Sequence, residues 1–233
     1  MMSWKQKVPL ICRMKINKLR KIRKFSDLFG RYAVGAMRGY VAFSVSSNEW
    51  SRVAIGKDVQ IHRGTLLHIN GLSNATQIKI DSRVFIGQNC YFSAGKLISL
   101  GHDSLIGASC RFLGAGHVYS DPQVPYAKAK VVSYGEIVLE PNCWVGTGST
   151  LVGDVHIGFG AVIAASSLVR GVVPPLSLVA GSPSQIRKLF NWHTKEWCSV
   201  SDDPIILEKS LQDHISNLPS LVTFINSLKF NAT

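Results

Sequence analysis

The stretch from Val145 to Leu168 reads VGTGST LVGDVH IGFGAV IAASSL, which is four consecutive units of six residues. Each unit opens with an aliphatic residue, and small residues dominate its second and fifth places. An aliphatic side chain at the first place fills the interior of a triangular coil, while the small residues let the backbone turn at the corners. Three such units make a coil of about 18 residues, and stacked coils bury a continuous core through parallel strand pairing.

The same pattern extends toward the N-terminus, so that the repeat occupies most of residues 53–182. Further units with an aliphatic first residue are Ile55–Gln60, Ile86–Tyr91, Leu100–Leu105 and Ile106–Arg111. Cys90, Cys110 and Cys143 stand at the small place of their units, so we expect them to fill the core. The period of six is recognised as that of a left-handed parallel β-helix. The usual right-handed preference of parallel crossovers would not predict this fold, so the assignment rests on the repeat itself. The expected fold is mainly β.

The repeat is interrupted, and each interruption is a candidate functional segment. It breaks at about residues 116–136, where Pro122, Pro125 and a lysine-rich stretch intervene, and a smaller excursion lies near Asn70–Gln77. A loop as long as the first one inside a repeat body is typical of a functional loop. We therefore expect a β-helix domain over residues 51–183 with an external loop at about 116–136.

Helical segments are expected on both sides of this domain. Residues 184–233 are predicted to be a helical extension, in which Gln185–Phe190 begins a basic helix that caps the open edge of the coil. Asp202–Thr233 has the apolar spacing of an amphipathic helical tail. Residues 1–50 are predicted to be a basic, helical N-terminal arm.

The net charge of +12 is concentrated in this arm. Residues 1–40 hold 11 of the 26 Lys and Arg residues and one of the 14 acids, so they carry +10 and the rest of the chain carries +2. Ile16, Leu19, Ile22 and Phe25 recur at spacings of three, which suits a helix that packs on the protein's own core or adsorbs to an anionic membrane surface. Nothing in the nearly neutral body favours nucleic acid as a partner.

The targeting signals that can be read from the sequence are few. No run of about 18 apolar residues exists, and charges interrupt the N-terminus where a signal peptide would be apolar. We therefore expect a cytoplasmic protein, with peripheral contact at the inner face of the membrane through the basic arm.

Several motifs resemble those of the hexapeptide-repeat acyltransferases, especially the branch of maltose/galactoside and polysaccharide O-acetyltransferases. The resemblance covers roughly residues 53–190 and rests on Cys143-Trp144-Val145-Gly146, the repeats to Leu168 and the closing Val179-Ala180-Gly181-Ser182-Pro183. It implies transfer of an acetyl group from acetyl-CoA to a sugar hydroxyl, in surface polysaccharide biosynthesis (capsule, O-antigen or exopolysaccharide). It also implies a homotrimer whose active sites lie between adjacent subunits.

The resemblance assigns the chemistry to His117, which stands where the external loop begins. A sugar hydroxyl is a poor nucleophile at neutral pH, and a neutral imidazole can take its proton during attack on the thioester and return that proton to the leaving thiolate. Asp121 is a candidate to orient His117 or to contact substrate, although Asp-Pro is also an ordinary turn. Ser93 occupies the position where the sugar acetyltransferases place an Asn near the acyl group, which leaves the oxyanion contact open.

The resemblance also assigns a groove for the cofactor. Thr147 and Ala165 match residues beside the pantetheine arm, and Arg170 falls where the family often has Thr or Ser followed by Lys. Arg187 and Lys188 match basic residues that meet the cofactor phosphates, a task that suits cationic side chains. Their alternative role is that of a solvated helix face.

Other functions remain open at this point. The acceptor can instead be the amino group of an amino sugar or the hydroxyl of serine, although N-acetyltransferases of nucleotide sugars often carry a Rossmann-like domain that is not visible here. A metal-dependent carbonic anhydrase built on the same coil needs a second loop histidine shortly after His117, and the residues around Pro122 offer none, so no metal is expected. A non-catalytic scaffold is the third alternative.

Overall fold

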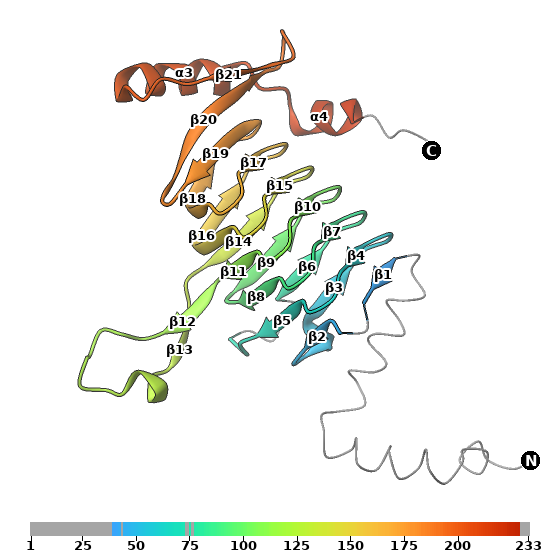
Figure 1. The fold of residues 1–233 in the computed structure, drawn as a ribbon, viewed down its shortest axis with the longest axis vertical. Coiled ribbons are helices and arrows are strands. Elements are labelled where there is room, and N and C mark those ends of the chain that lie inside the picture. Colours follow the sequence, from blue (N-terminus) through green and yellow to red (C-terminus); the bar gives the residue numbers. More distant parts are fainter. Residues whose placement is uncertain (1–38, 43, 73–74, 76, 229–233) are drawn as a thin grey trace, which may run out of the picture.

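The structure is a computed structural model that describes residues 39–42, 44–72, 75 and 77–228. These residues form a stack of coils, in which each turn of the chain contributes one short strand to each of three faces (Figure 1). Strands of successive coils pair in parallel. The mainly β, parallel body predicted from the repeat is thus confirmed, and its left-handed sense stays a prediction.

Each face is a ladder of strands that lie one coil apart in the sequence. The first face contains β1 (Tyr40–Val41), β4 (Gln60–Ile61), β7 (Phe85–Ile86), β10 (Leu105–Ile106), β15 (Trp144–Val145), β17 (Val162–Ile163) and β19 (Ser177–Gly181). The second contains β2 (Ser46–Ser47), β5 (Leu66–Ile69), β8 (Tyr91–Ala94), β11 (Arg111–Leu113) and the first parts of β16 (Thr150–Ile157) and β18 (Leu168–Val173). The third contains β3 (Val53–Ile55), β6 (Ile78–Ile80), β9 (Leu97–Leu100), β14 (Glu136–Leu139) and the last parts of β16 and β18.

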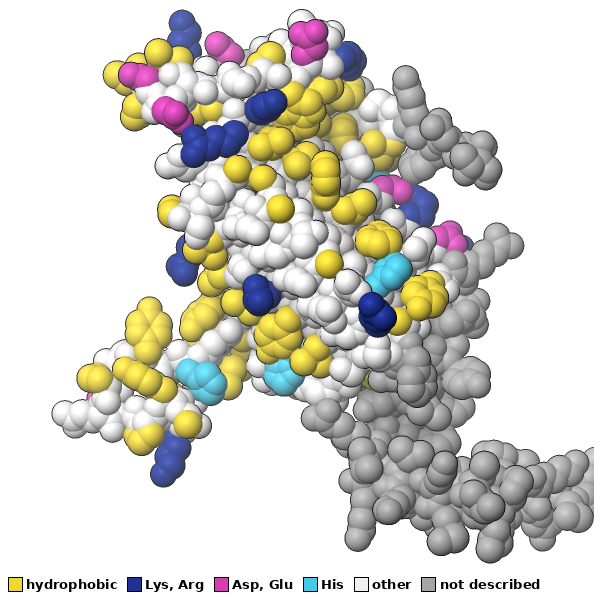
Figure 2. Space-filling view, viewed as in Figure 1, with side chains coloured by type: hydrophobic (Ala, Val, Ile, Leu, Met, Phe, Trp, Pro, Cys, Tyr) yellow, Lys and Arg dark blue, Asp and Glu magenta, His cyan; other side chains and the backbone are white. Residues whose placement is uncertain are grey.

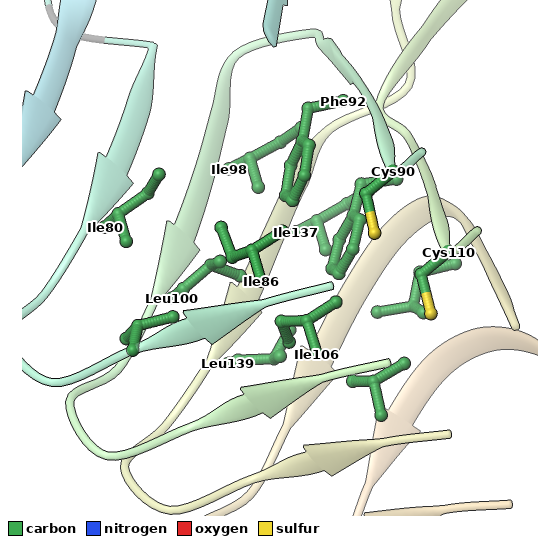
Figure 3. Close-up of a cluster of buried hydrophobic side chains, with 14 of the residues drawn as sticks. Ile80, Ile86, Cys90, Phe92, Ile98, Leu100, Ile106, Cys110, Ile137 and Leu139 are labelled. Carbon is green, nitrogen blue, oxygen red and sulfur yellow. The ribbon is translucent and has the colours of Figure 1, made fainter. Parts of the chain in front are cut away.

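The core fills the inside of the coil from end to end. The first-place residues Ile86, Ile106, Val145 and Ile163 are all 0% exposed, and Figure 3 shows such side chains from neighbouring coils stacked on one another. Phe92 and its neighbour one coil on, Phe112, stack with ring centroids 4.5 Å apart and an interplanar angle of 5°. Stacked apolar rungs of this kind bury a continuous core in which each coil depends on its neighbours.

The thiols of Cys90, Cys110 and Cys143 lie inside this core, as their repeat positions predict. Small residues are also required where the corners of successive coils touch. A Cβ atom added to Gly107 would lie 2.6 Å from the backbone nitrogen of Thr147, so only glycine allows this approach. The corner therefore brings the backbones of two coils into direct contact.

The external loop leaves the coil as a hairpin that projects sideways (Figure 1). β12 (Ala115–His117) pairs antiparallel with β13 (Val131–Ser133), and a short 3-10 helix, η3 (Tyr126–Lys128), lies between them. The hairpin carries exposed apolar side chains, including Tyr119 at 75% and Tyr126 at 55%, and stands clear of the body in Figure 2.

The coil starts earlier than residue 51. β1 and β2 pair with the next coil, and Val45 is 0% exposed inside the core, so residues from 40 onward belong to the coil and only part of the stretch 1–50 can be an arm. A further 3-10 helix, η2 (Trp50–Arg52), links the first coil to β3. The predicted helix within the arm lies in residues 1–38, outside the described residues.

The C-terminal end differs from the predicted helical cap. Gln185–Phe190 is not a helix but part of strand β20 (Ser184–Asn191), which pairs antiparallel with β19 and with β21 (Glu196–Ser199). Two helices follow, α3 (Pro204–Ser216) and α4 (Leu221–Ser227), and both lie within the tail that was predicted to be helical. Among the described residues, no helix is both long and apolar enough to cross a membrane.

The end of the coil is closed by a second apolar cluster. Phe159 and Leu176 of the last coils pack against Phe224 of α4, with the rings of Phe159 and Phe224 4.7 Å apart. His214 of α3 donates a hydrogen bond from Nε2 to the carbonyl oxygen of Pro175 at 2.8 Å. These contacts cover apolar surface that the last coil would otherwise expose.

Candidate active site

His117 ends strand β12 at the base of the hairpin and its side chain is exposed. Its Nδ1 atom lies 2.9 Å from the carbonyl oxygen of Ala129 on the returning arm. A carbonyl oxygen can only accept, so Nδ1 carries the proton, and in the neutral ring Nε2 keeps a lone pair. The backbone of the hairpin therefore selects the tautomer that a general base needs.

Among the described residues, no hydrogen bond joins Asp121 to this imidazole. Its Oδ1 atom accepts a hydrogen bond from the backbone nitrogen of Gln123 at 2.9 Å, which is the geometry of an Asx turn. The structure thus shows the turn, and a contact of Asp121 with substrate stays a prediction. The partner that sequence reasoning missed is the carbonyl group of Ala129, since no side-chain pattern marks a backbone acceptor twelve residues away.

The place where the hairpin returns to the coil is held by charged groups. Asp154 Oδ1 accepts a hydrogen bond from the backbone nitrogen of Glu136 at 2.8 Å, and Lys96 Nζ lies 2.7 Å from Glu136 Oε1. The hydrogen bond to Glu136 and the attraction between the charges raise the pKa of Lys96. Gly135, with φ of +122°, allows the sharp re-entry beside Asp154.

Ser93 faces outward on β8, one coil below the strand that leads into the hairpin. In the parallel ladder it lies between His68 of β5 and Leu113 of β11. Its hydroxyl accepts a hydrogen bond from Asn70 Nδ2 at 3.1 Å, and the residue is only 7% exposed. Asn70 is a contact that the sequence did not reveal, because it stands where the repeat becomes irregular.

Thr147 and Ala165 are exposed neighbours on one corner of the coil. They follow β15 and β17, and the backbone nitrogen of Ser166 donates to the carbonyl oxygen of Thr147 at 2.9 Å. A Cβ atom on Gly146 would lie 2.5 Å from the nitrogen of Ala165, so the two turns are in close contact. The structure thus brings these two predicted cofactor residues together.

The three predicted cationic residues are all exposed, but they differ in their partners. Arg170 lies on β18 at the corner between the second and third faces. Arg187 Nη1 forms an ion pair with Asp202 Oδ1 at 2.9 Å, so its charge is partly offset. Among the described residues, no carboxylate forms an ion pair with Lys188.

The correction of Gln185–Phe190 from helix to strand has a physical reason. Ile186 and Leu189 stand three apart, as on a helix, yet both face the core because the pairing of β20 with β19 shifts register between them. A β-bulge of this kind places two residues of one strand opposite one residue of the other. Arg187 and Lys188 are both exposed as a result.

Several known proteins are similar to this chain in sequence or in fold. WbbJ of Escherichia coli (strain K12), provisionally named as a lipopolysaccharide biosynthesis O-acetyl transferase, is 26% identical over 127 residues, covering 52% of this chain and 64% of WbbJ. A provisionally named acetyltransferase of Staphylococcus aureus (strain Mu50) is 35% identical over 117 residues, covering 49% of this chain and 56% of that protein. The chain is similar in sequence to these acetyltransferases.

This relationship confirms the resemblance drawn from the repeat and the closing motif. No family model matches the chain. The alignments span 56% of the Staphylococcus aureus protein and 64% of WbbJ. Among solved structures, AntD, an N-acyltransferase from Bacillus cereus in complex with dTDP and 3-hydroxybutyryl-CoA, superposes with a TM-score of 0.53 at 18% identity, over 75% of this chain and 87% of AntD. This likeness shows the fold alone.

In this structure, the predicted site residues do not meet within one chain. Thr147 and Ala165 lie at the corner between the first and second faces, whereas the hairpin with His117 leaves from the corner between the second and third faces. The width of the second face separates the two groups. A cavity of about 340 Å³ lies elsewhere, between β20, β21 and α3, and none of these residues lines it.

Within the described ranges, no group of three or more His, Cys, Asp or Glu side chains is arranged to hold a metal ion. His102 Nδ1 pairs with Asp103 Oδ2 at 2.6 Å on the corner between the third and first faces, and His156 Nε2 of β16, on the third face, pairs with Glu140 Oε1 at 2.9 Å. These two histidines are therefore engaged in surface pairs. The described residues offer no positive support for the carbonic anhydrase alternative.

Proposed function

We propose that this protein transfers an acetyl group from acetyl-CoA to a sugar hydroxyl, with His117 as the general base. The observation that carries the proposal is the hydrogen bond from His117 Nδ1 to the carbonyl oxygen of Ala129, which leaves Nε2 as the basic atom of an exposed imidazole. The relationship to acetyltransferases supports the group that is transferred. The name of WbbJ favours a hydroxyl acceptor in surface polysaccharide biosynthesis.

The reaction needs one proton acceptor that later becomes a donor. Nε2 of His117 takes the proton of the sugar hydroxyl as its oxygen attacks the thioester carbon, and the imidazolium is held by Ala129. When the carbon–sulfur bond breaks, the same proton moves to the thiolate. General acid–base catalysis of this kind contributes about 10²–10⁴-fold to the rate.

The corner of Thr147 and Ala165 suits the pantetheine arm of acetyl-CoA. Both residues are exposed, and their small side chains leave the surface of this corner uncovered. Lys188 is the best placed of the cations for a cofactor phosphate, because Arg187 already pairs with Asp202. Arg170 lies at the other edge of the second face. In an assembly of several copies, its side chain would therefore face the cofactor groove of a neighbouring subunit.

A homotrimer would bring the two edges together. His117 and Thr147 lie at opposite edges of the second face, so a neighbouring subunit must supply one of them. The outer row of the first face favours self-association. None of its side chains is charged, and all are apolar except that of Gln60. Its apolar members are Tyr40, Phe85, Leu105, Trp144, Val162 and Leu178. An exposed apolar row of this length is typical of a protein interface.

The cellular setting is part of the proposal. We infer a cytoplasmic enzyme that visits the inner face of the membrane, because the basic arm can adsorb to anionic lipid and an acceptor can be held there. The arm itself lies mostly in residues 1–38, outside the described residues. Deleting it and measuring cosedimentation with anionic vesicles tests this contact separately from catalysis.

The decisive experiment compares His117→Ala with His156→Ala. Release of CoA is measured against a panel of acceptors that includes sugars, amino sugars and serine, and binding of acetyl-CoA is measured by calorimetry. We expect His117→Ala to lower kcat by about 10²–10⁴-fold without loss of acetyl-CoA binding. His156→Ala, which removes an exposed histidine paired with Glu140, controls for the loss of an imidazole.

Three outcomes contradict the proposal in different ways. A wild-type rate for His117→Ala removes the general base from the mechanism. Transfer to an amino sugar but to no hydroxyl makes the protein an N-acetyltransferase. Failure of the wild-type protein to bind acetyl-CoA favours a non-catalytic scaffold.

A further inference from the structure

A cavity of about 340 Å³ lies beyond the last coil, between the hairpin of β20 and β21 and helix α3. Figure 1 shows α3 beside β21 at the C-terminal end of the stack. Ligand pockets in proteins have volumes of about 300–1,000 Å³, so this cavity has room for a small ligand. His117, Thr147 and Ala165 do not line it, so it is separate from the proposed catalytic residues.

Helix α3 turns a polar side toward this cavity. The polar residues that line it are spaced by three, four and seven positions, which places them on one side of the helix. They are Ser210, Asp213, His214 and Asn217. Ile205 and Ile215 lie on the other side of α3 and are 80% and 57% exposed. A helix that only covered apolar surface would turn such isoleucines inward, so the polar side of α3 is placed for a ligand.

This polar side carries acceptors to which no donor of the described residues bonds. His214 Nε2 donates to the carbonyl oxygen of Pro175 at 2.8 Å, so Nδ1 keeps its lone pair in the neutral ring. Asn217 Nδ2 donates to the backbone carbonyl oxygen of Asp213 at 2.7 Å, which leaves Oδ1 as an acceptor. Within the described part of the chain, the Asp213 carboxylate has neither an ion pair nor a hydrogen bond. The wall formed by α3 therefore offers acceptors, one of them negatively charged.

The wall formed by the hairpin is apolar and is held in place. Phe190 and Trp192 line the cavity and pack against the apolar cluster that closes the end of the coil. Their rings meet at an interplanar angle of 70°. Lys195 Nζ lies 3.4 Å from the centroid of the Trp192 ring, so a positive charge already stands beside this wall.

Together the two walls limit the chemical class of the ligand. A phosphate or carboxylate group would be repelled by Asp213, so neither CoA nor a nucleotide suits the cavity. A polyamine supplies donors, but Asp213 is the one acidic residue among the described lining residues, and Lys195 repels a second cation. A sugar ring carries hydroxyl donors around its edge and apolar C–H groups on its face, which match both walls.

We propose that this cavity binds a neutral sugar residue of a glycan. The hydroxyl groups of the sugar donate hydrogen bonds to Asp213, His214 and Asn217 on α3. Its C–H face packs against Phe190 and Trp192. The ligand is recognised without any covalent step, so binding can be measured in the absence of acetyl-CoA.

The bound sugar is a different residue of the glycan from the one that is acetylated. The hairpin of His117 leaves the coil that contains β10, and four strand spacings separate β10 from β20 in the first face. At about 4.8 Å per spacing, the two sites lie about 19 Å apart along the coil. Only an acceptor of several sugar units can occupy both sites, and this assignment to the acceptor rests on the proposed function.

The experiment titrates the full-length protein with uncharged trisaccharides of glucose, galactose and N-acetylglucosamine, without acetyl-CoA. Calorimetry measures the affinity. The rate at which iodoacetamide alkylates Cys198 reports occupancy, because this thiol lines the cavity. We expect at least one trisaccharide to bind and to slow this alkylation. Asp213→Asn keeps the size of the side chain but removes its charge, so it should weaken binding by about tenfold.

Matched variants separate the cavity from the rest of the surface. Glu208→Gln removes a charge from an exposed position of α3 outside the cavity and should keep the affinity within about twofold of wild type. Ser210→Trp fills the cavity from α3 and should abolish binding, and the melting temperature of each variant shows that it is folded. In turnover, Asp213→Asn should raise the KM for an oligosaccharide acceptor but leave the KM for the monosaccharide and kcat unchanged.

Each outcome bears on one of the two proposals. If no trisaccharide binds, the sugar assignment is wrong, and binding of spermidine that Asp213→Asn abolishes would make the cavity a cation site. If the trisaccharide binds Asp213→Asn and Ser210→Trp as tightly as wild type, the sugar site lies elsewhere. If a trisaccharide binds in the cavity but no acceptor is acetylated, the sugar site stands and the proposed function fails.

Discussion

Single side chains report the environment inside the coil, and the cysteines do so most directly. Burial raises the pKa of the Cys143 thiol to about 12. Its Sγ atom also donates to the carbonyl oxygen of Glu140 at 3.0 Å, which holds the proton in place. Cys198, on β21, is exposed. A thiol reacts through its thiolate, so these two residues should differ strongly in reactivity.

This contrast predicts the pattern of alkylation by iodoacetamide in the native protein at pH 8. Cys198 should react at least about 100-fold faster than Cys143, because burial both blocks access to the Cys143 thiol and raises its pKa. Peptide mass spectrometry of time points measures the two rates, and the unfolded protein in denaturant serves as the control in which they converge. Equal rates in the native state would mean that the coil opens readily at this corner.

At the scale of elements, the local sequence pattern predicted the strands that recur in every coil. It did not predict strand β20, which forms a single pairing outside the repeat. The pattern of Val145–Leu168 predicts its strands, because each unit must fill the same triangular space. Strand β20 has no such period, and its spacing of Ile186 and Leu189 imitates a helix, since only the pairing with β19 reveals the bulge. The hydrogen bonds of Asn70 could not be predicted for a similar reason, because its partners Ser93 and Ala94 lie one coil away.

The bulge in β20 leads to a prediction about the cofactor. Lys188→Gln should raise the KM for acetyl-CoA by about three- to tenfold, and added salt should reduce the difference, since an exposed charge contact contributes about 1 kcal/mol and is screened. Arg187→Gln should have a smaller effect because Asp202 already offsets its charge. Lys209→Gln on α3 is the control, with an exposed lysine outside the proposed groove. Equal effects of all three changes would point to general charge attraction instead of a site.

At the scale of the whole molecule, the position of the site residues follows from the geometry of the coil. A coil with three faces has corners that lie apart, and this chain places its basic atom at one and its small exposed backbone turns at another. The repeat in the sequence was sufficient to predict the corners, but it carries no information on what covers the outer faces. Charge and exposure along each row supply that information only once the register is known.

The outer row of the first face should therefore control both assembly and activity. Leu105 is 44% exposed and lies next to Trp144, at 53%, so Leu105→Glu would bury a charge if two copies meet there. We expect this variant to elute as a folded 25.5 kDa protomer in light-scattering chromatography, and we expect the wild type to elute with three times that mass. Its kcat/KM should fall at least about 100-fold, because His117 then lacks the cofactor corner of a neighbour. Val172→Glu, at a 76% exposed position on the third face, is the matched control and should keep both mass and rate. A Leu105→Glu protein that stays trimeric and active would place the interface on another face of the coil.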